Sequence, residues 1–136
     1  MFSYSHLSAQ LIPRKYESLK EIACARLMDA HSVALTCDGW TSRRTQSYIT
    51  ITAHFFSKNT EDWKLYSLVL QTREHEESHT ATNIAEVINT AKEEWKLEQI
   101  SAVVTDNAPN MRNAVEDIGC YQVFCSAHTL QLCVHK

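Results

Sequence analysis

The spacing of apolar residues changes between helical and strand-like along the chain. From Pro13 to about residue 30, apolar side chains recur every three or four positions, which predicts an amphipathic helix. Residues 32–38 form a short apolar run, and residues 47–57 alternate between apolar and polar, so both segments predict strands. Residues 63–71 predict a third strand that is more fully buried. Three consecutive strands with short connections favour an antiparallel meander.

The second half of the sequence alternates helices with strands. A helix capped by Ser78 or Thr80 has an apolar stripe that includes Ile84, Ile88 and Trp95. After it we expect a strand at residues 100–105, a helix at 109–117, a strand at 121–125 and a helix that starts near Ser126. A meander followed by two crossover units predicts an α/β fold, with a mixed five-stranded sheet and helices on both of its faces.

Composition narrows the class of protein without indicating a function. The chain has 136 residues, of which 44% are apolar and 21% are charged, so a globular domain with a real core is expected. We expect an irregular segment over residues 1–12 and one domain over residues 13–136. No apolar run approaches the length of a membrane span, and the N-terminus does not resemble a signal peptide. These features predict a soluble intracellular protein with no membrane partner.

Charge and cysteine content exclude two further classes. The net charge is −3, and the basic pairs Arg14-Lys15 and Arg43-Arg44 are small, whereas a free-standing DNA-binding domain usually carries a positive surface. If the protein acts on DNA, most of the affinity must therefore come from other regions. Five cysteines are an odd number without regular spacing, and Cys24 and Cys37 lie in apolar runs, so a disulfide framework is not expected.

Two aspartates follow two of the apolar strand-like runs. Asp38 closes the run of residues 32–37, and Asp106 closes residues 100–105. The carboxyl ends of parallel strands form the active crevice of crossover sheets. Two divalent ions roughly 4 Å apart, held by carboxylates, activate a hydroxyl and stabilise the leaving oxygen in phosphodiester cleavage. On this hypothesis Asp38 bridges the two ions and Asp106 holds one of them.

A purely structural role for the aspartates is the alternative. Asp38-Gly39 is a favoured turn pair, and Asp106 before Asn107-Ala108-Pro109 suits a helix N-cap.

Cysteine and histidine are concentrated in the last seventeen residues, as Cys120, Cys125, His128, Cys133 and His135. A zinc site usually needs two closely spaced ligand pairs, and the sequence offers no clean second pair. We therefore do not expect zinc, and favour a capped helix that places Cys125 and His128 near the acidic crevice.

The remaining aromatic side chains and histidines give weaker indications. Trp40 either packs beside the site or stacks on a base, with packing favoured. His54 is expected on a strand face, and His75 and His79 in a solvated loop. The last two tryptophans, Trp63 and Trp95, are expected in the core.

Three ordered motifs resemble those of one known family. The segments are Asp38–Ser42 with Tyr48 and Thr52–Phe56, then Val104–Met111, then Cys125–Leu132. Together they resemble the catalytic blocks of hAT-superfamily DNA transposases, especially the BED-zinc-finger-containing group that includes transposon-derived host genes. The resemblance covers about residues 12–136.

The resemblance implies a ribonuclease-H-like fold and a DDE-type mechanism on DNA. It assigns Asp38 and Asp106 to the first two metal-ligand positions, for Mg²⁺ or Mn²⁺, with Trp40, Asn107 and the CxxH pair Cys125 and His128 near the site. In the family, the third acidic ligand is a glutamate after a large helical insertion, and we expect this chain to end before it. The family's DNA-binding BED finger and its C-terminal dimerisation region are likewise expected outside the chain.

Two main hypotheses follow for the function. The first is the nuclease core of a hAT-type transposase or domesticated relative, located in the nucleus and little active with two carboxylates. The second is a non-catalytic scaffold in a transposon-derived transcriptional regulator, in which the aspartates are only turn and cap residues. A zinc-binding module at the C-terminal cysteines and histidines is a third, weaker hypothesis.

Overall fold

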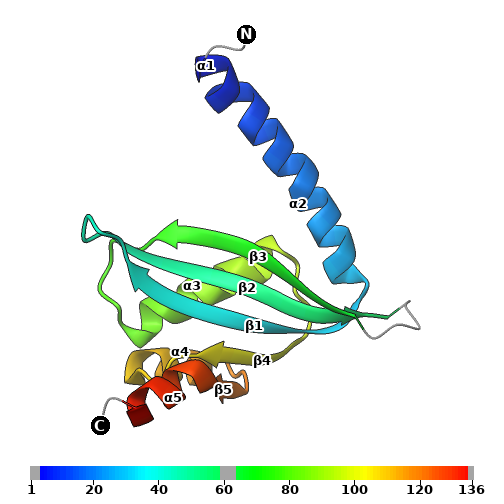
Figure 1. The fold of residues 1–136 in the computed structure, drawn as a ribbon. Coiled ribbons are helices and arrows are strands. Elements are labelled where there is room, and N and C mark those ends of the chain that lie inside the picture. Colours follow the sequence, from blue (N-terminus) through cyan, green and yellow to red (C-terminus); the bar gives the residue numbers. More distant parts are fainter. Residues whose placement is uncertain (1–3, 59–63, 135–136) are drawn as a thin grey trace.

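The computed structural model describes residues 4–58 and 64–134, in which helices pack against a single sheet (Figure 1). Among the described residues the elements are α1 (Tyr4–His6), η1 (Leu7–Leu11), α2 (Ile12–Met28), β1 (Ala30–Thr41), β2 (Ser47–Ser57), β3 (Leu65–Glu74), α3 (Ala81–Glu94), β4 (Ile100–Thr105), α4 (Pro109–Asp117), β5 (Gln122–Phe124) and α5 (Ser126–Val134).

The sheet has the mixed topology that the sequence predicts. Its five strands lie in the order β3-β2-β1-β4-β5. β1, β2 and β3 form an antiparallel meander, whereas β4 pairs parallel to β1 and β5 parallel to β4. Because both crossovers return to the same sheet, the carboxyl ends of β1, β4 and β5 meet at one edge. The predicted ribonuclease-H-like α/β fold is confirmed.

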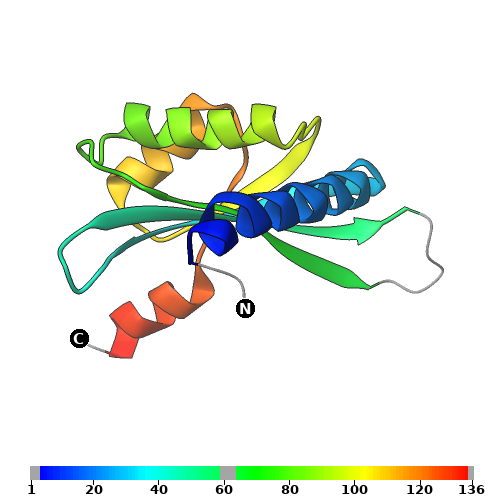
Figure 2. The ribbon, with the colours of Figure 1, turned by 90° about the horizontal axis from the view of Figure 1, so that it is seen from above.

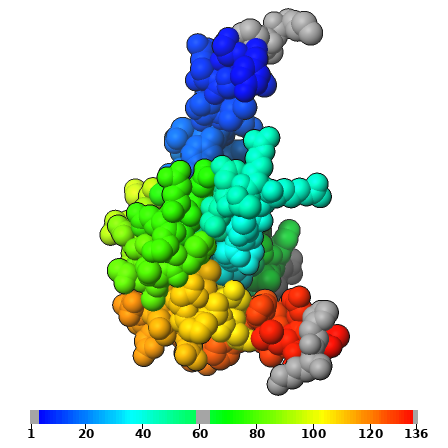
Figure 3. All heavy atoms as spheres, turned by 90° about the vertical axis from the view of Figure 1, so that its left-hand side faces the viewer, coloured from blue at the N-terminus to red at the C-terminus, as the bar shows by residue number. Residues whose placement is uncertain are grey.

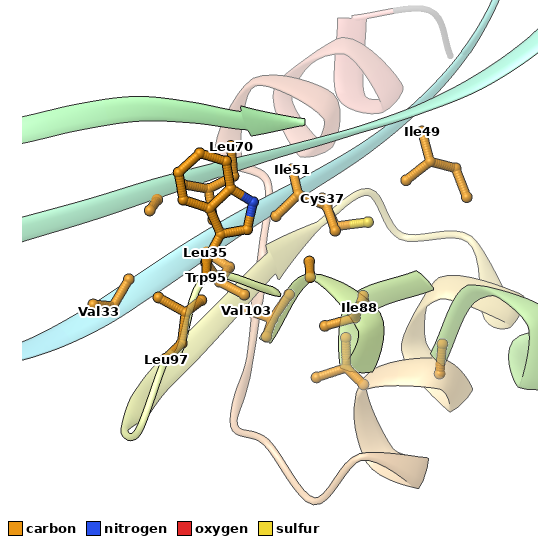
Figure 4. Close-up of a cluster of buried hydrophobic side chains, with 14 of the residues drawn as sticks. Val33, Leu35, Cys37, Ile49, Ile51, Leu70, Ile88, Trp95, Leu97 and Val103 are labelled. Carbon is orange, nitrogen blue, oxygen red and sulfur yellow. The ribbon is translucent and has the colours of Figure 1, made fainter. Parts of the chain in front are cut away.

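The core lies on the face of the sheet that α3 and α4 cover (Figures 2 and 4). Alternate residues of the central strands point into it, and Leu35, Ile51 and Val103 are fully buried. Figure 2 places α5 on the other side of the sheet, so the helices occupy both faces as expected.

Helix α3 begins with a side-chain cap. The Thr80 hydroxyl accepts a hydrogen bond from the Asn83 amide, which supplies a partner for one of the free N–H groups of the first turn. Its apolar stripe includes the buried Ile84 and Ile88, and Trp95 follows at 4% exposure. The predicted cap, stripe and core position of Trp95 are confirmed.

The N-terminal segment differs from the expectation. Residues 4–11 are helical, as α1 and the π-helical η1, and continue directly into α2, whereas residues 1–12 were expected to be irregular. The apolar stripe of α2 is buried only toward its C-terminal end, since Leu27 is 6% exposed whereas Leu19 and Ile22 are each more than half exposed. Figure 1 shows the reason: the helix projects away from the sheet and meets it only near its C-terminal end.

Strand β3 is not the well-buried strand that the sequence indicated. It lies at the edge of the sheet, with Leu70 buried but Leu65 and Val69 exposed by 56% and 66%. The apolar run of β3 carries apolar residues on both of its faces, but helices cover only one face there. Trp63, expected in the core, lies outside the described residues.

No helix in the described parts of the chain combines the length and apolarity that crossing a membrane requires.

Candidate active site

The register of the sheet brings the two aspartates to neighbouring positions. Thr36 of β1 is the pairing partner of Val104 of β4, and each aspartate lies two residues further along its strand. Asp38 and Asp106 therefore occupy equivalent positions on adjacent parallel chain segments, which run about 4.8 Å apart in sheets. The even spacing also places both on the sheet face that Thr36 and Val104 share, opposite the core.

Asp38 lies within β1 rather than at its end, which corrects the expected turn at Asp38-Gly39. The strand continues to Thr41, and Asp38 pairs with Thr50 of β2. Gly39 serves packing instead, because a Cβ at this position would lie 3.1 Å from the Met111 methyl carbon of α4. The absent side chain lets α4 approach β1 closely beneath the acidic pair.

Asp106 follows β4 and has a partner in the loop. Its Oδ1 accepts a hydrogen bond from the Ala108 amide at 3.1 Å, which forms a tight side-chain turn. The expected role as N-cap of α4 is therefore wrong, because Ala108 is the N-cap residue. The buried Thr105 hydroxyl donates to the Asp106 carbonyl and accepts from the side-chain amide of Gln122. These two hydrogen bonds fix the backbone at this point.

The Cys37 thiol lies on the core side of β1, and burial and the charges of both carboxylates affect its pKa. Burial, together with the negative charges of Asp38 and Asp106, raises the pKa of its thiol to about 12. A charge effect of Asp106 on a residue of β1 agrees with the register argument that the two acids lie together. The thiol stays protonated at neutral pH and is not a nucleophile.

The pairing of β4 with β5 brings residues of the last segment to the same edge. Thr105 pairs with Phe124 of β5, so the next residues, Asp106 and Cys125, again occupy equivalent positions. The Cys125 amide donates to the Thr105 carbonyl at 2.8 Å, and α5 starts immediately after it. His128 lies one turn into α5 and is half-buried.

Asn107 connects this loop to α5. Its side-chain amide donates to the Thr129 hydroxyl at 3.2 Å, and that hydroxyl donates to the Cys125 carbonyl. Asn107 and Cys125 thus lie next to the end of β4, and His128 lies in the first turn of α5.

This edge offers a metal ion two carboxylates, which is fewer than a complete set of protein ligands. Across the described part of the chain, no three His, Cys, Asp or Glu side chains are grouped so that they could hold a metal ion. All five cysteines are free; Cys120 packs against the core and Cys133 is exposed. His135 lies outside the described residues. The donor atoms of the acidic pair are hard oxygens, which suit Mg²⁺ or Mn²⁺ and leave the other coordination positions to water or further ligands.

Polar side chains form connected rows across the open face of the sheet. His54 lies between two hydroxyls, with Nε2 3.3 Å from Thr36 Oγ1 and Nδ1 2.9 Å from Ser67 Oγ. The expectation of a strand-face histidine is confirmed. In the next row, the Thr50 hydroxyl is 3.0 Å from that of Thr72.

Trp40 lies on the open face of the sheet, two residues beyond Asp38 on β1. Its indole N–H donates to Thr50 Oγ1 at 3.1 Å, and its ring stacks on Tyr48 with centroids 4.6 Å apart. The ring remains 43% exposed. Trp40 packs on Tyr48, in line with the packing role favoured from the sequence, but the ring is only partly covered.

The β1–β2 hairpin is a feature that the sequence analysis undervalued. Residues 42–46 connect the two strands, and in Figure 3 this hairpin (cyan) protrudes from the surface. It carries the exposed Arg43 and Arg44 beyond the acidic edge. The sequence did contain a signal for this role. Arg43 and Arg44 lie between two predicted strands, close to Asp38, Trp40 and Tyr48.

His75 corrects another expectation. It was predicted in a solvated loop but is only 8% exposed, and its ring meets that of His79 edge to face at 4.9 Å. Its backbone N–H donates to the Ser47 carbonyl and so extends the pairing of β2 with β3 by one residue. His75 is therefore a structural residue at the end of the hairpin.

The fold and the site define a ribonuclease-H-like domain with an acidic pair at the carboxyl edge of its sheet. The sequence profile of the ZBED1 RNase-like domain matches residues 36–130, and the chain belongs to this family, which derives from hAT-type transposases.

Individual proteins support the assignment. Zinc finger BED domain-containing protein 4 of Homo sapiens is 27% identical over 97% of this chain and 12% of its own length. The putative AC transposase of Zea mays is 30% identical over 76% of this chain and 13% of its length. The putative transcriptional regulator tpeD of Talaromyces stipitatus is 26% identical over 97% of this chain and 16% of its length. The chain thus spans less than a fifth of the relatives that it matches.

Proposed function

We propose that this domain is the nuclease core of a hAT-type cut-and-paste DNA transposase or of a domesticated relative. The observation that carries the proposal is the β1–β4 register, which brings Asp38 and Asp106 to equivalent positions at the open carboxyl edge. Two relatives that share this region are named as transposases, which supports DNA as the substrate.

The two carboxylates are assigned the role of divalent-cation ligands. Asp38 is exposed and open to a divalent cation from solvent, whereas Asp106 is partly buried and held by the Ala108 amide, which leaves its other oxygen for a cation. Divalent cations, when bound, stabilise negative charge on the attacking and leaving oxygens. The chain's own contribution is to hold two acid groups side by side on rigid strands, with Thr105 and Gly39 fixing the backbone around them.

Titration with Mn²⁺, followed by electron paramagnetic resonance, tests this assignment. The purified chain should bind Mn²⁺ weakly, and Asp106→Asn should abolish the binding because an amide carries no charge. This variant keeps a side-chain oxygen that can accept from Ala108, so the turn should persist. Asp117→Asn, which removes an exposed acid at the end of α4, is the matched control and should bind as the wild type does.

Catalysis by the 136-residue chain alone is expected to be little or none. Only two acidic ligands are brought together by the described residues, and a DDE-type site requires a third. Incubation of supercoiled DNA with the chain and Mg²⁺ or Mn²⁺ checks this expectation. Nicking that disappears in Asp38→Ala would contradict it.

A second candidate function is a non-catalytic scaffold in a transcriptional regulator. It is favoured by the relative named as a transcriptional regulator, which matches 97% of this chain, and by the turn that Asp106 forms through its side chain. On this alternative, Mn²⁺ does not bind and Asp106→Asn leaves the folded domain unchanged. The Mn²⁺ titration therefore separates the two candidates.

Both candidates act on or near DNA, so we propose that the protein works in the nucleus and that regions outside this domain provide most of the DNA affinity. The domain's net charge of −3 supports that division. Homo-oligomerisation through a region outside this domain also stays a proposal.

A further inference from the structure

The β1–β2 hairpin combines a rigid turn with exposed positive charge. The Ser42 amide donates to the Gln46 carbonyl at 2.8 Å, and the Ser42 hydroxyl accepts from the Arg44 and Gln46 amides at 3.3 and 3.2 Å. Thr45 takes a positive φ of 62°, which completes the tight turn. The hairpin thus holds Arg43 and Arg44 on an ordered backbone rather than on a loose loop.

An aromatic platform lies at the base of the same hairpin. Tyr48 covers one side of the Trp40 ring, and the Thr50 hydroxyl fixes the orientation of the indole through its N–H. The pairing of β1 with β4 ends at Thr36↔Val104, so β4 does not extend alongside Trp40. Among the described strands, none pairs with β1 at Trp40 on the side away from Tyr48, and the ring is 43% exposed.

The hairpin itself carries two positive charges and no acidic residue over residues 42–46. The chain is acidic as a whole, yet its two adjacent arginines extend past the acidic pair, at the end of the sheet where Asp38 lies. Arginine binds phosphate through a planar fork of donors, and a fixed aromatic ring stacks on any base. Neither feature is needed for the core, because Trp40, Arg43 and Arg44 are all exposed.

We propose that this hairpin is a binding element for single-stranded DNA, in which Trp40 stacks on an unpaired base and Arg43 and Arg44 bind the neighbouring phosphates. The inference rests on the proposed nuclease function, since it places a DNA strand beside the acidic pair. It adds to that function the residues that position the strand and the form of DNA that they recognise.

Fluorescence anisotropy with two labelled probes tests the platform. One probe is a short oligothymidylate and the other is an abasic oligonucleotide of the same length, both in EDTA so that no metal contributes. The wild type should prefer the oligothymidylate by about tenfold, a typical value for one stacked base. Trp40→Leu should bind both probes equally, whereas Trp40→Phe, which keeps a ring, should retain part of the preference.

Tyr121→Leu is the matched aromatic control, because Tyr121 is 73% exposed and precedes β5 at the opposite end of the sheet. It should keep the full preference. Equal binding of both probes by the wild type, or no binding at low ionic strength, would overturn the proposal.

The salt dependence of binding tests the arginines. Arg43→Gln/Arg44→Gln should weaken binding of both probes by the same factor and lower the slope of log affinity against log salt by about 1.4, or 0.7 per single-strand phosphate contact. Arg14→Gln/Lys15→Gln removes the same charge from α2 and should leave the slope nearly unchanged. An equal fall of the slope in both double variants would show a general charge effect and refute the hairpin site.

The experiment also separates this inference from the nuclease proposal. Asp38→Asn/Asp106→Asn should keep the thymidylate preference in EDTA, because the acids do not contact the base. If the preference is present but Mn²⁺ does not bind to the wild type, the hairpin site stands and the nuclease proposal fails. If Mn²⁺ binds but the preference is absent, the reverse holds.

Discussion

The two faces of the central sheet differ in what their side chains do. On the core face, residues such as Leu35, Ile51 and Val103 are fully buried under α3 and α4. On the open face, their neighbours Thr36 and Thr52 are partly exposed, and the hydroxyl of Thr36 bonds to a histidine ring. One face therefore stabilises the fold, and the other presents the groups that can meet a ligand.

The comparison teaches how a sheet can present polar and acidic side chains without losing stability. Alternation along a strand separates the two tasks by a single residue, since Cys37 belongs to the core and Asp38 to the open face. Substitutions on the open face can therefore change the candidate chemistry while the core stays intact. The following predictions test this separation.

The largest expected effect is on the core face. Ile51→Ala should lower the free energy of unfolding by about 3–4 kcal/mol, because it removes a fully buried side chain and leaves a cavity. Thr52→Ala, its neighbour on the open face, should cost less than about 1 kcal/mol. Urea denaturation followed by circular dichroism measures both. Equal losses would mean that the open face is also covered in solution.

Next in size is a pH effect at Cys37. The pKa of this thiol is about 12 in the folded chain, above its ordinary value of 9.0, so the unfolded state loses its proton first as the pH rises. Stability from the neutral thiol is therefore complete below pH 9 and falls between about pH 9 and 12. The decline should approach ~1.4 kcal/mol per pH unit.

The comparison with Cys37→Ala isolates this contribution, because lysines and tyrosines titrate in the same range. The wild type should lose stability more steeply than the variant between pH 9 and 11, and Cys133→Ala, at an exposed position, should follow the wild type. Parallel curves for the wild type and Cys37→Ala would show that the thiol does not sense the core or the acidic pair.

A smaller loss of stability is expected at Thr105, a core-face residue directly before Asp106. Thr105→Val keeps the shape of a buried side chain but removes the hydroxyl between the Asp106 carbonyl and the Gln122 amide. The loss should be about 1–2 kcal/mol, since the partly buried side-chain amide of Gln122 is left without its acceptor. Weaker Mn²⁺ binding should accompany it, because Asp106 follows directly. Thr72→Val, which removes an exposed hydroxyl, should change neither quantity.

The smallest effect is expected at the exposed ion pair of Arg73 and Glu94. Nη2 of Arg73 lies 2.5 Å from the Glu94 carboxylate, but the two side chains are 46% and 37% exposed, so water screens the attraction. A double-mutant cycle with Arg73→Gln and Glu94→Gln should give no more than about 0.5 kcal/mol, decreasing with added salt. A coupling above 2 kcal/mol would mean that this edge of the sheet is shielded from solvent.

Much of this architecture was predictable from local patterns. The alternation in residues 47–57 gave β2 with its bounds, and the capping chemistry of Thr80 gave the start of α3. Residues 100–105 and 109–117 were also predicted with the bounds that the structure has. In these segments, side-chain spacing and burial agree, so periodicity alone is informative.

Patterns failed where burial depends on partners far away in the sequence. The apolar stripe of α2 and the apolar run of β3 predicted buried segments, yet each element is covered only in part. Leu27 and Leu70 are buried, whereas Leu19 and Val69 are more than half exposed. The Asp38-Gly39 pair suggested a turn, but pairing with β2 extends the strand through it to Thr41. Turn propensity is weaker than a continuous ladder of hydrogen bonds.

From residue 12 onward, the amino-acid sequence by itself determined which helices and strands form, their order, and the presence of an acid after each of two apolar runs, because these depend on side-chain spacing within a few residues. Only the tertiary structure decided that β4 inserts beside β1 with Thr36 opposite Val104, and hence that Asp38 and Asp106 are neighbours. It also decided that Trp40 and the hairpin arginines lie at the same edge. Strand register joins residues that are distant in sequence, and it is set by how the whole sheet packs on α3 and α4.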